Sequence, residues 1–94
     1  MLHQIEELLS ADAPKLDTLE STLTEGYAQA LALEAERWRL ERRLGEVARS
    51  GGAEMGDEIS SLGRRLTVAD DELVKLRSLL GTLHERARTA RTTS

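Results

Sequence analysis

The chain has 94 residues, enough for one small domain, and it contains no cysteine, which excludes disulfide frameworks, thiolate zinc sites and cysteine nucleophiles. Acidic and basic residues are mixed and the net charge is −4, so the composition gives no electrostatic reason to bind nucleic acid. The sequence shows neither the basic start of a signal peptide nor an apolar stretch of about 18 residues, so we expect a cytoplasmic protein without membrane contact.

Residues 1–12 predict a short amphipathic segment at the N-terminus. Leu2, Ile5 and Leu9 fall at helical spacing and give about two turns of helix, which is too short to be stable in water alone. Pro14 disfavours a helical residue before it and suits the first turn of a helix after it. We therefore expect a second helix to begin there, in a domain that spans 13–91.

A heptad pattern predicts a long helix at about 55–90. Apolar residues recur there at alternating steps of four and three. Heptad position a holds Ile59, Leu66, Leu73, Leu80 and Ala87, and position d holds Met55, Leu62, Ala69, Leu76, Leu83 and Ala90. One helix cannot bury so narrow a seam, because the apolar side chains need a facing helix to pack against. The pattern therefore requires a helical partner.

The same chain supplies that partner as a helix at about 14–48. Its seam consists of Leu16, Leu19, Leu23, Gly26, Ala30, Leu33, Arg37, Leu40, Leu44 and Val47. Gly51 and Gly52 lie in a predicted turn at 49–54 and supply the positive φ angles that a helix C-cap requires. The expected fold is all-α: a long antiparallel coiled-coil hairpin after a short N-terminal helix, with a disordered tail at 92–94.

The register of the hairpin follows from pairing residues whose numbers sum to 106, because each a position then faces a d position. Small residues meet larger ones along this seam, and opposite charges meet beside it. The predicted neighbours include Gly26 and Leu80, Arg37 and Ala69, Val47 and Ile59, Arg43 and Glu58, and Glu36 and Arg65.

Arg37 is the one charged residue in the seam. A charge at such a position reduces stability and usually fixes register or partner number. Alternatively, the guanidinium extends past Ala69 to reach Glu34 or Glu41.

A second apolar stripe lies beside the seam of the 14–48 helix. This second stripe consists of Tyr27, Leu31, Ala35 and Trp38. On the opposite helix, Leu79 widens the apolar face in the same direction. We predict that these residues bind a partner, with two hairpins pairing as a homodimer into a four-helix bundle. Two alternatives remain: the stripe docks a different protein, or Trp38 lies flat on its own helix.

The search for catalytic and metal-binding residues is negative. His3 and Glu7 share a helical face, as two metal ligands would, and His84 flanks the seam, but ordinary surface placement explains each of them. The serines have no histidine at helical spacing, so one chain cannot assemble a nucleophile with its base. We predict a non-enzymatic protein with no cofactor and no metal.

One segment resembles a known bacterial family. Asp57, Ser61, Arg64, Val68 and Glu72 are similar in spacing to the acidic-Ser-Arg-Gln-Asp signature of the cyclic-di-GMP-responsive anti-sigma hairpins of actinobacteria. Val68 stands where that signature has glutamine. The resemblance implies a nucleotide-responsive regulator of transcription.

For a ligand-responsive regulator, the residues that we expect to hold an anionic nucleotide are Ser61, Arg64 and Arg65. A second resemblance involves the hairpin tip, because its acidic residues at 54–58 look like the tips of coiled-coil factors that enter the RNA polymerase secondary channel. Both resemblances imply a transcription regulator associated with RNA polymerase or a sigma factor.

The prediction from the whole sequence is a helical hairpin that binds another protein as an adaptor, regulator or small chaperone and self-associates through the second stripe. The alternative is the nucleotide-responsive or polymerase-associated regulator. The sequence does not identify the partner protein or its pathway.

Overall fold

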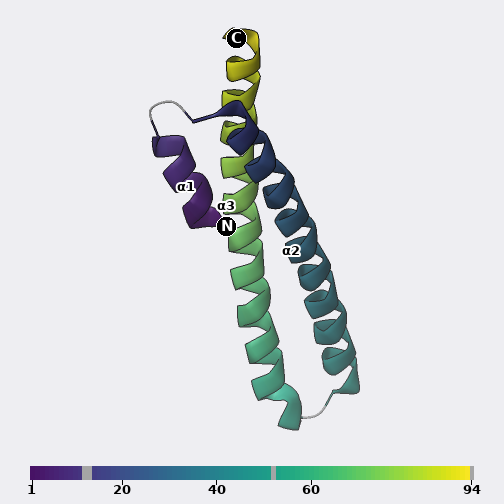
Figure 1. Cartoon of the computed structure of the whole chain (residues 1–94). Coiled ribbons are helices and arrows are strands. Elements are labelled where there is room, and N and C mark those ends of the chain that lie inside the picture. Colours follow the sequence, from purple (N-terminus) through teal and green to yellow (C-terminus); the bar gives the residue numbers. More distant parts are fainter. Residues whose placement is uncertain (12–13, 52, 94) are drawn as a thin grey trace.

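The computed structural model describes residues 1–11, 14–51 and 53–93. Its elements are α1 (Leu2–Ser10), α2 (Leu16–Ser50), a short 3₁₀ turn η1 (Ala53–Met55) and α3 (Gly56–Thr93). The long helices α2 and α3 pack side by side as an antiparallel hairpin, and α1 lies beside α3 (Figure 1). The molecule is a rod of 62 × 18 × 14 Å. The predicted all-α hairpin is confirmed.

The bounds of α2 differ slightly from the predicted ones. Lys15 has extended backbone angles (φ −69°, ψ 141°), so the helix begins at Leu16, two residues after Pro14. At the other end Gly51 adopts a left-handed conformation (φ 63°), and its N–H donates to the carbonyl of Val47 at 3.4 Å. This αL cap is the role predicted for the first glycine of the turn.

The helix α3 is longer than predicted. It continues through Thr93, so residues 92 and 93 are helical where a disordered tail was expected. The predicted domain boundary at 12–13, the second glycine of the turn and residue 94 lie outside the described residues.

The predicted register is confirmed where Gly26 faces Leu80. A Cβ atom placed on Gly26 would overlap Cδ2 of Leu80, and both residues are buried. Further along the hairpin, Arg43 Nη2 lies 2.8 Å from Glu58 Oε1, as the pairing predicted. The missing side chain at Gly26 therefore makes the space that Leu80 occupies.

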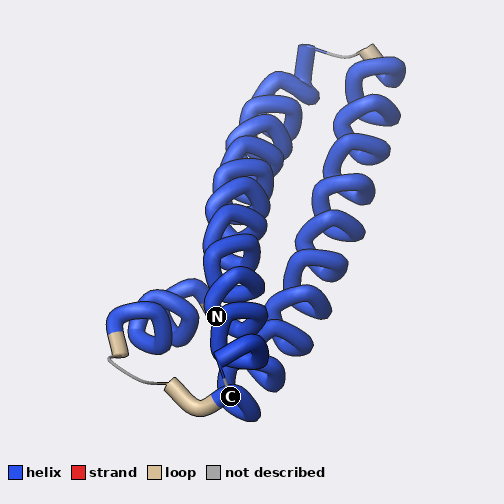
Figure 2. The backbone as a smooth tube through the Cα atoms, turned by 90° about the horizontal axis from the view of Figure 1, so that it is seen from above, coloured by secondary structure: helices blue, strands red, loops and turns tan. Residues whose placement is uncertain are grey.

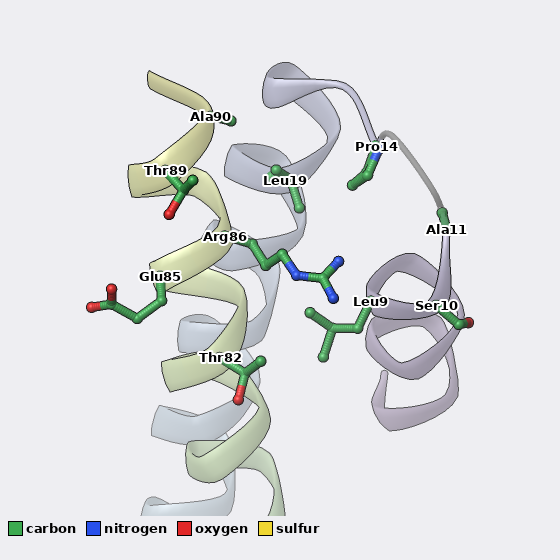
Figure 3. Close-up of a pocket in the computed structure, with 10 residues that line it drawn as sticks. All are labelled: Leu9, Ser10, Ala11, Pro14, Leu19, Thr82, Glu85, Arg86, Thr89 and Ala90. Atoms are coloured by element: carbon green, nitrogen blue, oxygen red, sulfur yellow. The ribbon is translucent and has the colours of Figure 1, made fainter. Parts of the chain in front are cut away.

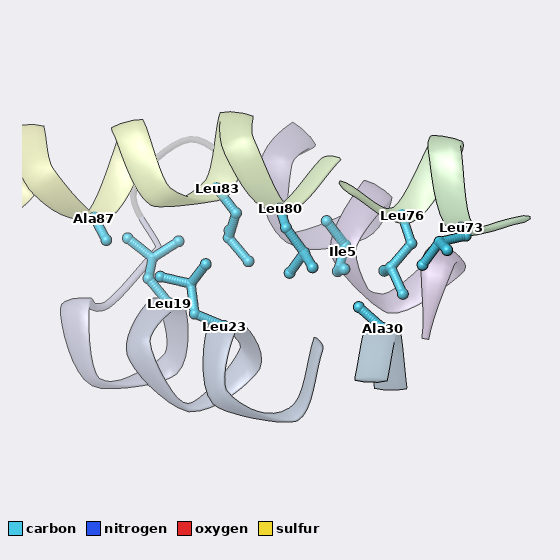
Figure 4. Close-up of a cluster of buried hydrophobic side chains, with 9 residues drawn as sticks. All are labelled: Ile5, Leu19, Leu23, Ala30, Leu73, Leu76, Leu80, Leu83 and Ala87. Atoms are coloured by element: carbon cyan, nitrogen blue, oxygen red, sulfur yellow. The ribbon is translucent and has the colours of Figure 1, made fainter. Parts of the chain in front are cut away.

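The apolar interior is divided into two clusters, which we call the terminal cluster and the tip cluster. The terminal cluster lies at the end of the hairpin that carries α1 (Figure 4). Its buried residues are Ile5, Leu19, Leu23, Ala30, Leu73, Leu76, Leu80, Leu83 and Ala87. The tip cluster lies toward the turn, with Leu40, Val47, Leu62 and Ala69 buried.

Arg37 lies at the boundary between the two clusters. Its Nε is 3.2 Å from Glu41 Oε1 and 3.0 Å from Asp70 Oδ1, while Ala69 is buried in the facing helix. The guanidinium thus leaves the seam and reaches acids at its edge, which confirms the predicted contact with Glu41. Asp70 is an additional partner that sequence analysis did not identify.

The seam is less complete at the tip than predicted. Val47 is buried, but Ile59, predicted to face it, remains 37% exposed. This pair belongs to one of the last layers before the turn, so few further residues cover it. The contribution of Ile59 to the interior is correspondingly smaller than that of the leucines in the middle of α3.

Glycine substitutions test the register. We expect Gly26→Ala to lower the free energy of unfolding by about 1–3 kcal/mol, because the added methyl group forces Leu80 out of its position. Gly63→Ala is the matched control, since a Cβ there has no atom within 4 Å. It should raise stability by roughly 0.5–1 kcal/mol through helix propensity. Urea denaturation measures both, and equal stabilisation by the two variants would contradict the Gly26–Leu80 layer.

Candidate functional site

The two sides of the hairpin seam differ in their residues. In an antiparallel pair of helices, residues just before an a position face each other on one side of the seam, and residues just after a d position face each other on the other. On α3 the first side, called the α1 flank, carries residues 58, 65, 72, 79 and 86. The second side, called the stripe flank, carries residues 70, 77, 84 and 91.

Helix α1 covers the α1 flank at the end of the hairpin away from the turn (Figure 2). Ile5 is 0% exposed and enters the terminal cluster beside Leu76 and Leu80 (Figure 4). Glu6 Oε1 lies 3.5 Å from Lys75 Nζ. The N-terminal segment is thus held mainly by burial of its apolar face.

Leu79 was predicted to belong with the second stripe, and this prediction is wrong. The structure places Leu79 on the α1 flank, half-buried against the terminal cluster. The reason is the antiparallel arrangement: Leu79 precedes the a position Leu80, whereas Tyr27 follows the d position Gly26. The two side chains therefore leave the seam on opposite sides.

A cavity of about 720 Å³ lies between α1 and the ends of α2 and α3 (Figure 3). Leu9 points into it from α1, and the guanidinium of Arg86 extends across it from α3 (Figure 3). Glu85 points away from this space in the same view. The lining combines apolar surface with the positive charge of Arg86.

The second stripe is exposed along α2. Leu31 is 67% exposed, Trp38 57% and Tyr27 49%, and Ala35 is exposed as well. The guanidinium carbon of Arg42 lies 4.8 Å from the centre of the Trp38 ring, so the indole stacks with a residue of its own helix. This contact agrees with the alternative in which Trp38 lies along α2, yet more than half of its surface stays open.

A groove of about 370 Å³ lies beside the second stripe on the stripe flank. Tyr27 and Leu31 border it on α2, Arg77 and Gly81 border it on α3, and Leu80 lies below. A Cβ atom on Gly81 would meet no atom within 4 Å. The absence of a side chain at Gly81 therefore leaves the groove open.

This groove was not predicted from the sequence. The feature of the sequence that indicates the groove is Gly81. This glycine directly follows Leu80, a large residue of the seam, and lies at the level of Leu31 in the second stripe. A glycine at that position leaves a gap beside the apolar stripe on the facing helix.

Ion pairs between α2 and α3 follow the stripe flank. Glu34 pairs with Arg77, and Glu20 Oε1 lies 3.1 Å from Arg91 Nε. Asp70 pairs with Arg37 on the same side. Exposed pairs of this kind contribute only about 0.2–1 kcal/mol each. In two of the three pairs the acid lies on α2 and the base on α3, and in the pair of Arg37 with Asp70 this order is reversed.

The predicted anion site does not assemble as proposed. A shallow groove of about 410 Å³ on the α1 flank brings Arg65 together with Arg39, Arg43 and Glu36. Ser61 and Arg64 are not part of its lining. Arg43 already donates to Glu58 from both Nε and Nη2. Of the three predicted residues, only Arg65 lies in this cationic groove.

The described residues provide no metal site. His3 Nε2 lies 2.9 Å from Glu7 Oε1 on the exposed face of α1. Within 1–11, 14–51 and 53–93, no three His, Cys, Asp or Glu side chains gather closely enough to hold a metal ion. The histidine and glutamate are thus an exposed pair one helical turn apart.

Among the helices that the structure describes, none is both long and apolar enough to cross a membrane. The chain matches no protein-family model, no curated protein and no solved structure with which it was compared. The functional assignment therefore depends on the geometry of the two flanks.

The docking of α1 is open to test. We expect Ile5→Ala to release α1, because the loss of about 2–5 kcal/mol of core packing exceeds what a nine-residue helix can offset. Amide hydrogen exchange should then become fast in α1, while the protection of α2 persists. Gln4→Ala, at an exposed position, is the control. Unchanged protection of α1 in Ile5→Ala would contradict this role.

Proposed function

We propose that this chain is a non-enzymatic helical-hairpin module that binds protein through the second stripe and also self-associates through it. The observation that carries the proposal is the contrast between the two flanks. Leu79, the apolar residue of the α1 flank on α3, is half-buried against the terminal cluster that Ile5 of α1 joins, whereas Tyr27, Leu31 and Trp38 stay exposed on the other side. An exposed apolar patch of this kind typically marks an interaction surface.

The spacing of the stripe favours a helical partner. Tyr27 and Trp38 are 11 positions apart on one helix, about 16 Å at 1.5 Å per residue, and Leu31 lies between them. Anchors at i, i+4 and i+11 match the way in which amphipathic helices recognise a groove or another helix. A module of this kind acts as an adaptor, regulator or small chaperone, according to the partner it holds.

Sedimentation equilibrium tests self-association. We expect the wild type to form dimers at tens of micromolar, and Trp38→Ala to raise the dissociation constant at least ~30-fold, since aromatic anchors at interfaces commonly contribute about 2 kcal/mol or more. Val68→Ala is the control, because Val68 is exposed to the same extent, 57%, but lies outside the second stripe. Monomers in both wild type and Trp38→Ala at these concentrations would rule out self-association.

The nucleotide-responsive regulator remains the second candidate, and the groove with Arg39, Arg43 and Arg65 is the observation that favours it. Calorimetric titration with cyclic dinucleotides distinguishes the two functions. The proposed docking module should give no binding heat in the micromolar range. Micromolar binding by the wild type that is lost in Arg65→Gln would instead support the regulator.

A further inference from the structure

We infer that the occupant of the stripe flank is a second copy of this chain, oriented with its turn at the same end, so that α2 of each copy lies on α3 of the other. This inference rests on the proposed function and specifies the partner and its orientation. The two-fold axis then runs along the length of the rod, and each residue meets the residue of the second copy that lies at its own level.

The ion pairs establish which residues share a level. Glu34 pairs with Arg77 and Glu20 pairs with Arg91, so the two helices keep a constant offset along the stripe flank. Leu31 and Gly81 both border the 370 Å³ groove. One heptad closer to the tip, Trp38 on α2 corresponds to Val74 on α3.

Charge selects the orientation with both turns at the same end. On the stripe flank α2 carries the acids Glu20 and Glu34, and α3 carries their partners Arg91 and Arg77. When α2 of one copy lies on α3 of the other, Glu20 and Glu34 each meet an arginine of the second copy as well as their own. The opposite orientation would instead set α2 on α2, the helix that carries both of these acids, and would remove their new arginine partners.

Size favours the same arrangement. Leu31 of one copy lies over Gly81 of the other and fills the groove that the missing side chain leaves open. Trp38 lies over Val74, which is 69% exposed in the single chain and has no role in the seam. The arrangement therefore covers exposed apolar residues on both helices, and each copy completes the groove of the other.

Cysteine cross-linking tests the orientation, since the natural chain contains no cysteine. Thr24 and Arg88 are exposed and lie at one level, one heptad beyond the Leu31–Gly81 level and away from the turn. We expect a mixture of Thr24→Cys and Arg88→Cys chains to form a mixed disulfide under mild oxidation. A mixture of Thr24→Cys and Gly45→Cys should not, because those positions meet only when the turns lie at opposite ends.

Filling the groove gives a second, independent readout. Gly81→Leu should weaken dimerisation at least tenfold without lowering the unfolding midpoint of the monomer, because leucine suits a helix better than glycine. Ser78→Leu adds the same side chain at an exposed position on the outer side of α3 and should leave the dimer unchanged.

The outcomes separate the two proposals. A dimer that cross-links through Thr24→Cys with Gly45→Cys, or that tolerates Gly81→Leu, overturns this geometry and leaves self-association intact. A wild-type chain that stays monomeric at tens of micromolar overturns both.

Discussion

The contact between Gly26 and Leu80 determines how the rest of the hairpin is arranged. Leu80 occupies the space that the missing side chain of Gly26 leaves, so a shift that set a larger residue opposite Leu80 would displace it. With this layer fixed, Arg43 reaches Glu58 and Glu34 reaches Arg77 on opposite sides of the seam. The register therefore also decides which apolar residues remain outside the core.

The sequence was sufficient to predict the seam, the turn and the register because each depends on periodicity or on glycine conformation. The seven-residue repeat along α3 and the left-handed Gly51 are local signals of this kind. The side of the seam on which a residue lies is not a local property, since it depends on how the two helices face each other. Leu79 was misplaced for that reason, and the side that α1 covers could not be predicted because its short linker gives no directional signal.

The candidate site was predicted in part. Tyr27, Leu31 and Trp38 could be identified because they form a helical stripe outside the heptad seam, and they are exposed as expected. The groove beside Gly81 is formed by residues of both α2 and α3. It can be predicted only when the alignment of the two helices along the rod is known. The predicted anion residues were chosen from spacing within α3, whereas the arginines that gather in the structure come from both helices.

The division of the interior at Arg37 gives the hairpin two regions that can open separately. Only a few buried side chains hold the half nearest the turn, whereas the other half is reinforced by Ile5 from a third helix. Local unfolding should therefore begin at the turn and extend only as far as Arg37.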